Sequence, residues 1–122
     1  MRLLTRSFDN IPHITHGYTV YAISTTKPQR YRDIPILYLF APPYDAQIGY
    51  NMTKDFDRFN ERMAAIFKQR GSVIEDWVRA NSEAKVCLVC WEGIDSCHRR
   101  LVVEAVKQAG EKLGIPITVD IG

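Results

Sequence analysis

Reactive side chains are concentrated in one short segment of the chain, residues 87–100, which reads CLVCWEGIDSCHRR. The candidate catalytic residues are Cys90, Glu92, Cys97 and His98, and the candidate ligand-binding residues are Trp91, Arg99 and Arg100. A thiol at a helix N-terminus beside guanidinium groups has a lowered pKa and is a stronger nucleophile. The free backbone N–H groups of a helix N-terminus, together with an arginine fork, bind anions such as phosphate.

Each cysteine also has a structural interpretation. Cys87 and Cys90 lie three residues apart in an apolar stretch that predicts a strand, so we expect their side chains to point to opposite faces and to form no zinc knuckle. We therefore expect Cys87 to be a core residue, and burial is also the favoured interpretation of Cys90. For Cys97, burial and a role as nucleophile are equally well supported.

His98 and Arg99 admit more than one role. Because His98 directly follows Cys97 on the predicted helix, a dyad of His98 with Cys90 across the loop is easier to form than one with Cys97. A metal site built from these three residues is the weakest hypothesis for the same reason, and we predict neither a metal nor a cofactor. Arg99 binds an anion in one interpretation and forms an ion pair with Glu92 that pins the loop in the other.

The elements around this segment alternate between strands and helices. β-branched and aromatic residues predict strands at residues 2–5, 18–23, 36–40, 84–90 and 117–121. Apolar residues at helical spacing predict helices at residues 53–69, 72–79 and, from residue 97 or 98, to 112. We expect Thr53 to cap the first helix, Gly71 to end it, and Ser72 with Glu75 to form a capping box for the second.

This order of elements indicates the α/β class. The final strand–helix–strand is a βαβ unit, which implies a parallel pair with a right-handed crossover. The continuous apolar run at residues 36–40 suits a strand buried on both faces of a parallel sheet, with helices covering those faces. Ligands bind such sheets at the carboxyl ends of the strands, where residues 90–100 are expected to lie.

Two motifs in this segment resemble a known family. Cys90-Trp91-Glu92 and, after a short loop, Cys97-His98-Arg99 are similar to the Cys-aromatic-Glu and Cys-His-Arg motifs of the family catalogued as domain of unknown function 488. Residues 21–24, 39–42 and 56–67 are similar to further segments of that family, so the resemblance covers most of the chain. Residues 95–96 (Asp-Ser) depart from the apolar residues or proline of many members. The resemblance implies a Rossmann-like three-layer sandwich with a mainly parallel sheet, and no established reaction.

The composition is that of an ordinary globular protein, with 46% hydrophobic and 25% charged residues. A length of 122 residues suits one α/β domain over residues 1–122. The longest apolar stretch, residues 34–43, is too short to span a bilayer, and the first residues lack the features of a secretory signal. We therefore expect a cytoplasmic protein without membrane contact, which agrees with three clustered cysteines.

The net charge of +2 does not by itself indicate nucleic-acid binding. Five basic residues nevertheless lie in the first quarter of the chain: Arg2, Arg6, Lys27, Arg30 and Arg32. Three hypotheses follow for residues 90–100: a site for a phosphate-bearing small molecule, a nucleotide or nucleic acid; a cysteine-dependent enzyme or redox protein that uses Cys90 or Cys97; and a motif that only stabilises the fold. The oligomeric state stays open.

Overall fold

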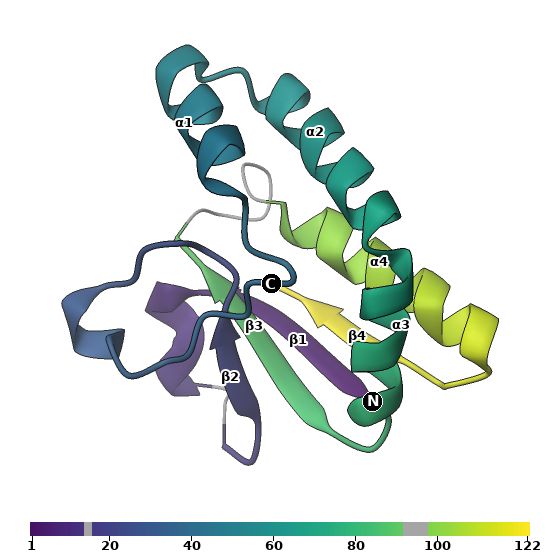
Figure 1. Ribbon diagram of the computed structural model, residues 1–122. Helices are drawn as coiled ribbons and strands as arrows, with labels where there is room; N and C mark the ends of the chain where they lie inside the picture. The colour runs from purple at the N-terminus through teal and green to yellow at the C-terminus, as the bar shows by residue number, and fades with distance from the viewer. Residues whose placement is uncertain (14–15, 92–97) are drawn as a thin grey trace.

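The chain folds around a parallel β-sheet, shown in Figure 1 by a computed structural model that describes residues 1–13, 16–91 and 98–122. The described strands are β1 (Arg2–Ser7), β2 (Thr19–Ala22), β3 (Lys85–Cys90) and β4 (Thr118–Ile121). They pair in the order β2-β3-β1-β4, and every pairing is parallel. The predicted strands near residues 2–5, 18–23, 84–90 and 117–121 are therefore confirmed.

Among the described residues, four α-helices cover one face of this sheet, and two short 3-10 helices lie on the other (Figure 1). The α-helices are α1 (Tyr44–Thr53), α2 (Phe56–Gln69), α3 (Gly71–Ala80) and α4 (Arg99–Leu113). The 3-10 helices are η1 (Phe8–His13) and η2 (Gln29–Tyr31). This arrangement is the Rossmann-like α/β sandwich. Within the described part of the chain, no helix combines the length and apolar character needed to cross a membrane.

The alternation of side chains along β3 divides the core into two clusters. Val86, Leu88 and Cys90 pack in the larger cluster under the α-helices. Cys87 and Val89 pack in the smaller cluster with Phe8, Ile11 and neighbouring residues of the η1 side. Successive side chains of a strand point to opposite faces, and burial on both faces explains the nearly continuous apolar sequence of β3. The prediction that Cys87 and Cys90 face opposite sides is confirmed, as is Cys87 as a core residue.

The order of the strands differs from the simple βαβ expectation. β3 and β4 run parallel, as predicted, but β1 lies between them and forms hydrogen-bonded ladders with both. β1 is buried along Leu3, Leu4 and Thr5, which suits a central position. The prediction of a directly paired β3 and β4 was wrong because local sequence pattern cannot reveal that an earlier strand inserts between them.

The predicted strand at residues 36–40 is absent. Only a single bridge joins Ile36 to Ala22, and the chain then turns, with the N–H of Phe40 donating to the carbonyl of Leu37 at 3.1 Å. Pro35 just before this run and two prolines after it limit ladder formation. The apolar run is used differently: Phe40 points into the core, where its ring meets the Phe67 ring edge-on with centroids 5.8 Å apart.

The predicted helix at residues 53–69 is in fact the second of two helices. α1 ends at Thr53, and Lys54 adopts a left-handed conformation with φ 56°. Asp55, not Thr53, caps α2, because its carboxylate accepts a hydrogen bond from the N–H of Arg58 at 3.1 Å. The sequence analysis missed α1 altogether, since Gly49 and Asn51 and an ill-defined apolar face are atypical of helices.

The predicted boundary between the second and third helices was also wrong. α3 begins at Gly71, so Gly71 does not end the preceding structure in a loop, and Ser72 lies inside the helix rather than at its cap. Glu75 reaches across to α4, where its carboxylate lies 3.0 Å from the ammonium group of Lys112. Arg70, at the junction, donates to the carbonyl of Leu39 at 2.8 Å and thereby ties the helices to the segment before α1.

Candidate functional site

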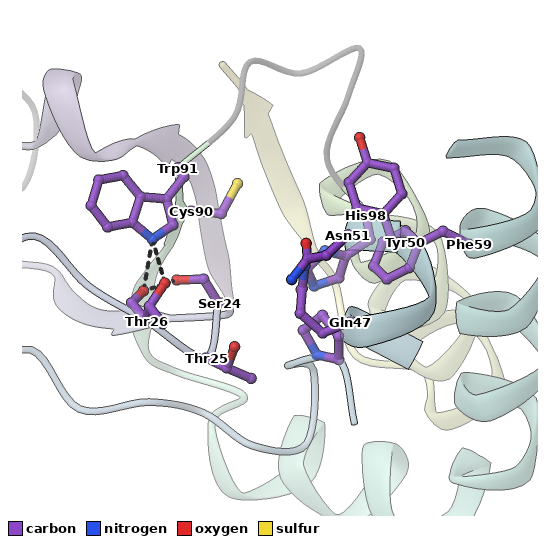
Figure 2. Close-up of a pocket in the computed structure, with 11 residues that line it drawn as sticks. Ser24, Thr25, Thr26, Gln47, Tyr50, Asn51, Phe59, Cys90, Trp91 and His98 are labelled. Carbon is purple, nitrogen blue, oxygen red and sulfur yellow. Dashed lines mark hydrogen bonds between the residues drawn. The ribbon is translucent and has the colours of Figure 1, made fainter. Parts of the chain in front are cut away.

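A cavity of about 360 Å³ opens where β2 and β3 end, between those strand ends and α1 (Figure 2). The segment after β2 contributes Ser24, Thr25 and Thr26; β3 and the residue after it contribute Cys90 and Trp91; α1 contributes Gln47, Tyr50 and Asn51; the remaining lining residues are Pro42, Phe59 and His98. Its position agrees with the general rule that open α/β sheets bind ligands at the carboxyl ends of strands.

One wall of the cavity is held together by the indole of Trp91. Its Nε1–H donates to both the carbonyl and the hydroxyl oxygen of Thr26, each at 2.9 Å (Figure 2). The hydroxyl of Ser24 donates to the same carbonyl at 2.6 Å. On its other side the indole meets the ring of Phe8 edge-on, with centroids 5.3 Å apart. Trp91 is therefore fixed in place although it is 47% exposed, and part of its surface stays accessible to a ligand.

The opposite wall is one face of α1. Gln47 and Asn51 lie one turn apart, and the Nε2–H of Gln47 donates to Oδ1 of Asn51 at 2.9 Å. The ring of Tyr50 packs on Phe59 of α2 with centroids 5.0 Å apart, which holds α1 against α2. Figure 2 shows both carboxamides on the side of the cavity that faces Trp91 and Thr26.

His98 is buried, with only 4% of its surface exposed. Its Nε2 lies 2.8 Å from the carbonyl oxygen of Phe40, so this nitrogen carries the proton and donates it. Burial lowers the pKa of His98 to about 4, although the backbone carbonyls of Phe40 and Ile23 act in the opposite direction. The imidazole is therefore neutral at pH 7, and its Nε2 is committed to joining the start of α4 to the segment before α1.

The cysteines of β3 differ in state. Cys87 is a free thiol, and burial raises its pKa to about 11, against smaller opposing effects of Arg6 and Arg99. Cys90 is disulfide-bonded and contributes to the cavity lining. Cys90 and His98 thus share one cavity, as the predicted dyad requires, but a sulfur in a disulfide is not a nucleophile.

The two arginines at the start of α4 have contrasting environments. Arg99 is 1% exposed, and its guanidinium donates to the carbonyl of Gly122 just after β4. Arg100 lies on the surface. Neither belongs to the described lining of the cavity, and the anion-binding role of both stays a prediction.

Two of the candidate catalytic residues, Glu92 and Cys97, lie outside the described residues. The predicted ion pair of Glu92 with Arg99 accordingly stays a prediction. In the described ranges of the chain, no group of three or more histidine, cysteine or acidic residues is placed to hold a metal ion.

The sequence analysis missed most of the cavity wall. Ser24 to Thr26 directly follow β2, so the rule that ligands meet the carboxyl ends of strands could have identified them. Gln47 and Asn51 gave no such signal, because polar residues on a helix are usually just solvated. Only the packing of α1 over the strand ends makes them part of a site.

The chain was compared with family models, with curated proteins and with solved structures. None of the three comparisons finds a match. The resemblance to the domain of unknown function 488 family therefore stays a prediction.

Proposed function

We propose that the cavity between α1 and the ends of β2 and β3 binds a small ligand of the nucleotide class. The observation that carries this proposal is the cavity itself: about 360 Å³, at the carboxyl ends of two adjacent parallel strands, with hydrogen-bonding groups on both walls. Its volume lies within the range of small-molecule sites, and its position is the usual one for nucleotides in this architecture.

The lining suits the neutral part of such a ligand. The described lining residues carry hydroxyl, carboxamide, phenol and indole groups, and none carries a formal charge, because His98 is neutral at pH 7. A phosphate group would be favoured at the N-terminus of α4, which begins immediately after the lining residue His98. We accordingly assign the base or nucleoside portion to the cavity.

A small molecule is favoured over nucleic acid because several N-terminal basic groups are engaged locally. The Arg6 guanidinium lies 2.7 Å from the carboxylate of Asp120, and that of Arg30 lies 3.1 Å from Asp9. The ammonium group of Lys27 donates to two backbone carbonyls, at 2.8 and 2.5 Å. An electrostatic footprint for a polynucleotide needs cations that are turned toward solvent on one face.

Nucleosides or nucleotides are expected to raise the melting temperature of the protein, and Trp91→Ala is expected to weaken their binding by about tenfold or more. Loss of one aromatic contact to a base typically costs about 1–3 kcal/mol. Thermal shift and isothermal calorimetry with nucleosides, mononucleotides and short oligonucleotides measure both effects. Tyr38→Ala is the control, because Tyr38 is 71% exposed and lies outside the cavity lining. No stabilisation by any mononucleoside or mononucleotide contradicts the proposal, and stabilisation by oligonucleotides alone favours nucleic acid.

A second candidate function is thiol–disulfide exchange, which the disulfide at the cavity-lining Cys90 favours. In this scheme Cys90 and Cys97 pass between a disulfide and two thiols, and an external dithiol supplies the two electrons and two protons of reduction. The disulfide partner of Cys90 can be identified by peptide mapping.

After reduction, Cys90 is expected to react with iodoacetamide in the native protein much faster than Cys87. At pH 8, raising the pKa of Cys87 from 9.0 to about 11 lowers its thiolate fraction roughly a hundredfold. Both cysteines are buried, but Cys90 lines the cavity, through which the reagent can reach it. Mass spectrometry of peptides after timed labelling measures each site, and labelling in urea shows that all thiols are intact. Equal, slow labelling of Cys87 and Cys90 in the native protein contradicts a redox role.

A further inference from the structure

The two carboxamides on the cavity face of α1 form a matched pair whose outward groups are determined by the bond between them. Gln47 donates its Nε2–H to Oδ1 of Asn51 at 2.9 Å. This bond leaves the carbonyl oxygen of Gln47 as an acceptor and the amino group of Asn51 as a donor. If both amide groups were rotated by half a turn, the donor and the acceptor would exchange places, but the pair would still offer one of each.

We infer that the carboxamide pair of Gln47 and Asn51 recognises the hydrogen-bonding edge of a nucleobase that has an adjacent donor and acceptor. This inference rests on the proposed function and specifies which part of the ligand the site reads. A nucleobase edge of this kind matches the pair with two hydrogen bonds, in the way that a single asparagine or glutamine pairs with adenine.

The rest of the cavity favours a planar, uncharged group beside this pair. Trp91 stands on the opposite wall, where its hydrogen bonds to Thr26 fix the indole (Figure 2). The Trp91 ring offers an aromatic surface of the kind on which bases stack. Because the described lining residues carry no formal charge, the discrimination among ligands must come from hydrogen bonds and shape.

The pair is also held in place before a ligand arrives. Both residues lie on one helix, which Tyr50 anchors against Phe59. The hydrogen bond between the two amides restricts the rotation of both side chains, so less conformational freedom is lost when a ligand binds. A site that is built to form specific hydrogen bonds rejects an analogue that lacks them, because its own polar groups are then left without partners.

The test compares uridine with 3-methyluridine, and adenosine with N6,N6-dimethyladenosine, by calorimetry. Each methylated analogue lacks the N–H donors of its base while keeping the ring. For the nucleoside that binds the wild-type protein, we expect methylation to weaken binding about tenfold or more. In Asn51→Ala and Gln47→Ala, we expect the unmodified nucleoside to bind about tenfold more weakly and the preference over its methylated analogue to fall to about twofold or less.

Gln108→Ala is the matched control. Gln108 also donates from its carboxamide to a residue one turn away on a helix, Glu104 at 3.0 Å, but lies outside this cavity. Its substitution should leave both affinities unchanged. If a nucleoside binds but the Gln47 and Asn51 variants keep the wild-type preference, the inference is wrong while the proposed function stands. If neither uridine nor adenosine binds the wild-type protein, the inference is wrong, and the proposed function fails as well only if no other mononucleoside or mononucleotide stabilises the protein.

Discussion

Replacement of Arg99 by alanine is expected to lower the free energy of unfolding by about 4 kcal/mol, whereas replacement of the exposed Arg100 by alanine lowers it by about 1 kcal/mol or less. Arg99 is the largest of the fully buried side chains, at 1% exposure. Its guanidinium donates to the carbonyl of Gly122 and so connects α4 to the end of β4. Alanine would leave a cavity in the interior, and it would leave the carbonyl of Gly122 without this donor.

Urea denaturation followed by circular dichroism measures this difference. Arg100→Ala is a close control, because it removes the same chemical group one residue later on the same helix, but from the surface. If Arg99→Ala does not fold, Arg99→Lys provides the measurement, since it retains charge and length but loses the fork of donors. An Arg99 variant as stable as the wild type, with weakened nucleotide binding, would instead support the anion-binding role suggested by the sequence.

The protein is also expected to lose about 3 kcal/mol of stability between pH 6.5 and pH 4 through His98 alone. Burial lowers the pKa of His98 in the folded state from 6.5 to about 4. Between these two values the unfolded chain binds a proton that the folded protein does not. The free energy of unfolding therefore rises with pH through this window. The contribution of His98 is fully present above pH 6.5 and is lost as the pH falls toward 4.

His98→Gln isolates this contribution from that of the carboxylates. Glutamine retains an N–H donor for the carbonyl of Phe40 but does not titrate, so the variant should be less stable at pH 7 and its difference from the wild type should shrink toward pH 4. Parallel pH profiles for wild type and His98→Gln would refute the argument. An NMR titration of the wild type gives a direct reading, with the His98 ring still neutral at pH 5.

The strands and the last helix could be predicted because their patterns are local. β3 is buried on both faces, so it reads as an apolar run, and α4 presents Val102, Val103 and Val106 to the core at helical spacing. The run at residues 36–40 has the same apolar character, yet it forms a turn. Burial of Phe40 requires an apolar side chain but no strand pairing. Composition therefore does not distinguish an apolar run that forms a strand from one that forms a buried turn.

The location of the candidate site could be anticipated only in part. Cys90, Trp91 and His98 were identified from the sequence and line one cavity, since a strand that leads into a helix places its loop at the ligand-binding edge of the sheet. Arg99 was identified from the same segment, but it is buried, donates to the carbonyl of Gly122 and lies outside the described cavity lining. Adjacent residues on a helix point about 100° apart, so sequence proximity does not imply a shared direction.

The parallel α/β sheet, and the position of the reactive residues after a buried strand, could be predicted from the order of the amino acids, because hydrophobic periodicity is a local property of the chain. Three other features became visible only in the folded chain: α1 forms the facing wall, Gln47 and Asn51 turn toward Trp91, and Arg99 lies in the interior. Those outcomes depend on which distant segments pack together, and packing is set by the whole chain at once.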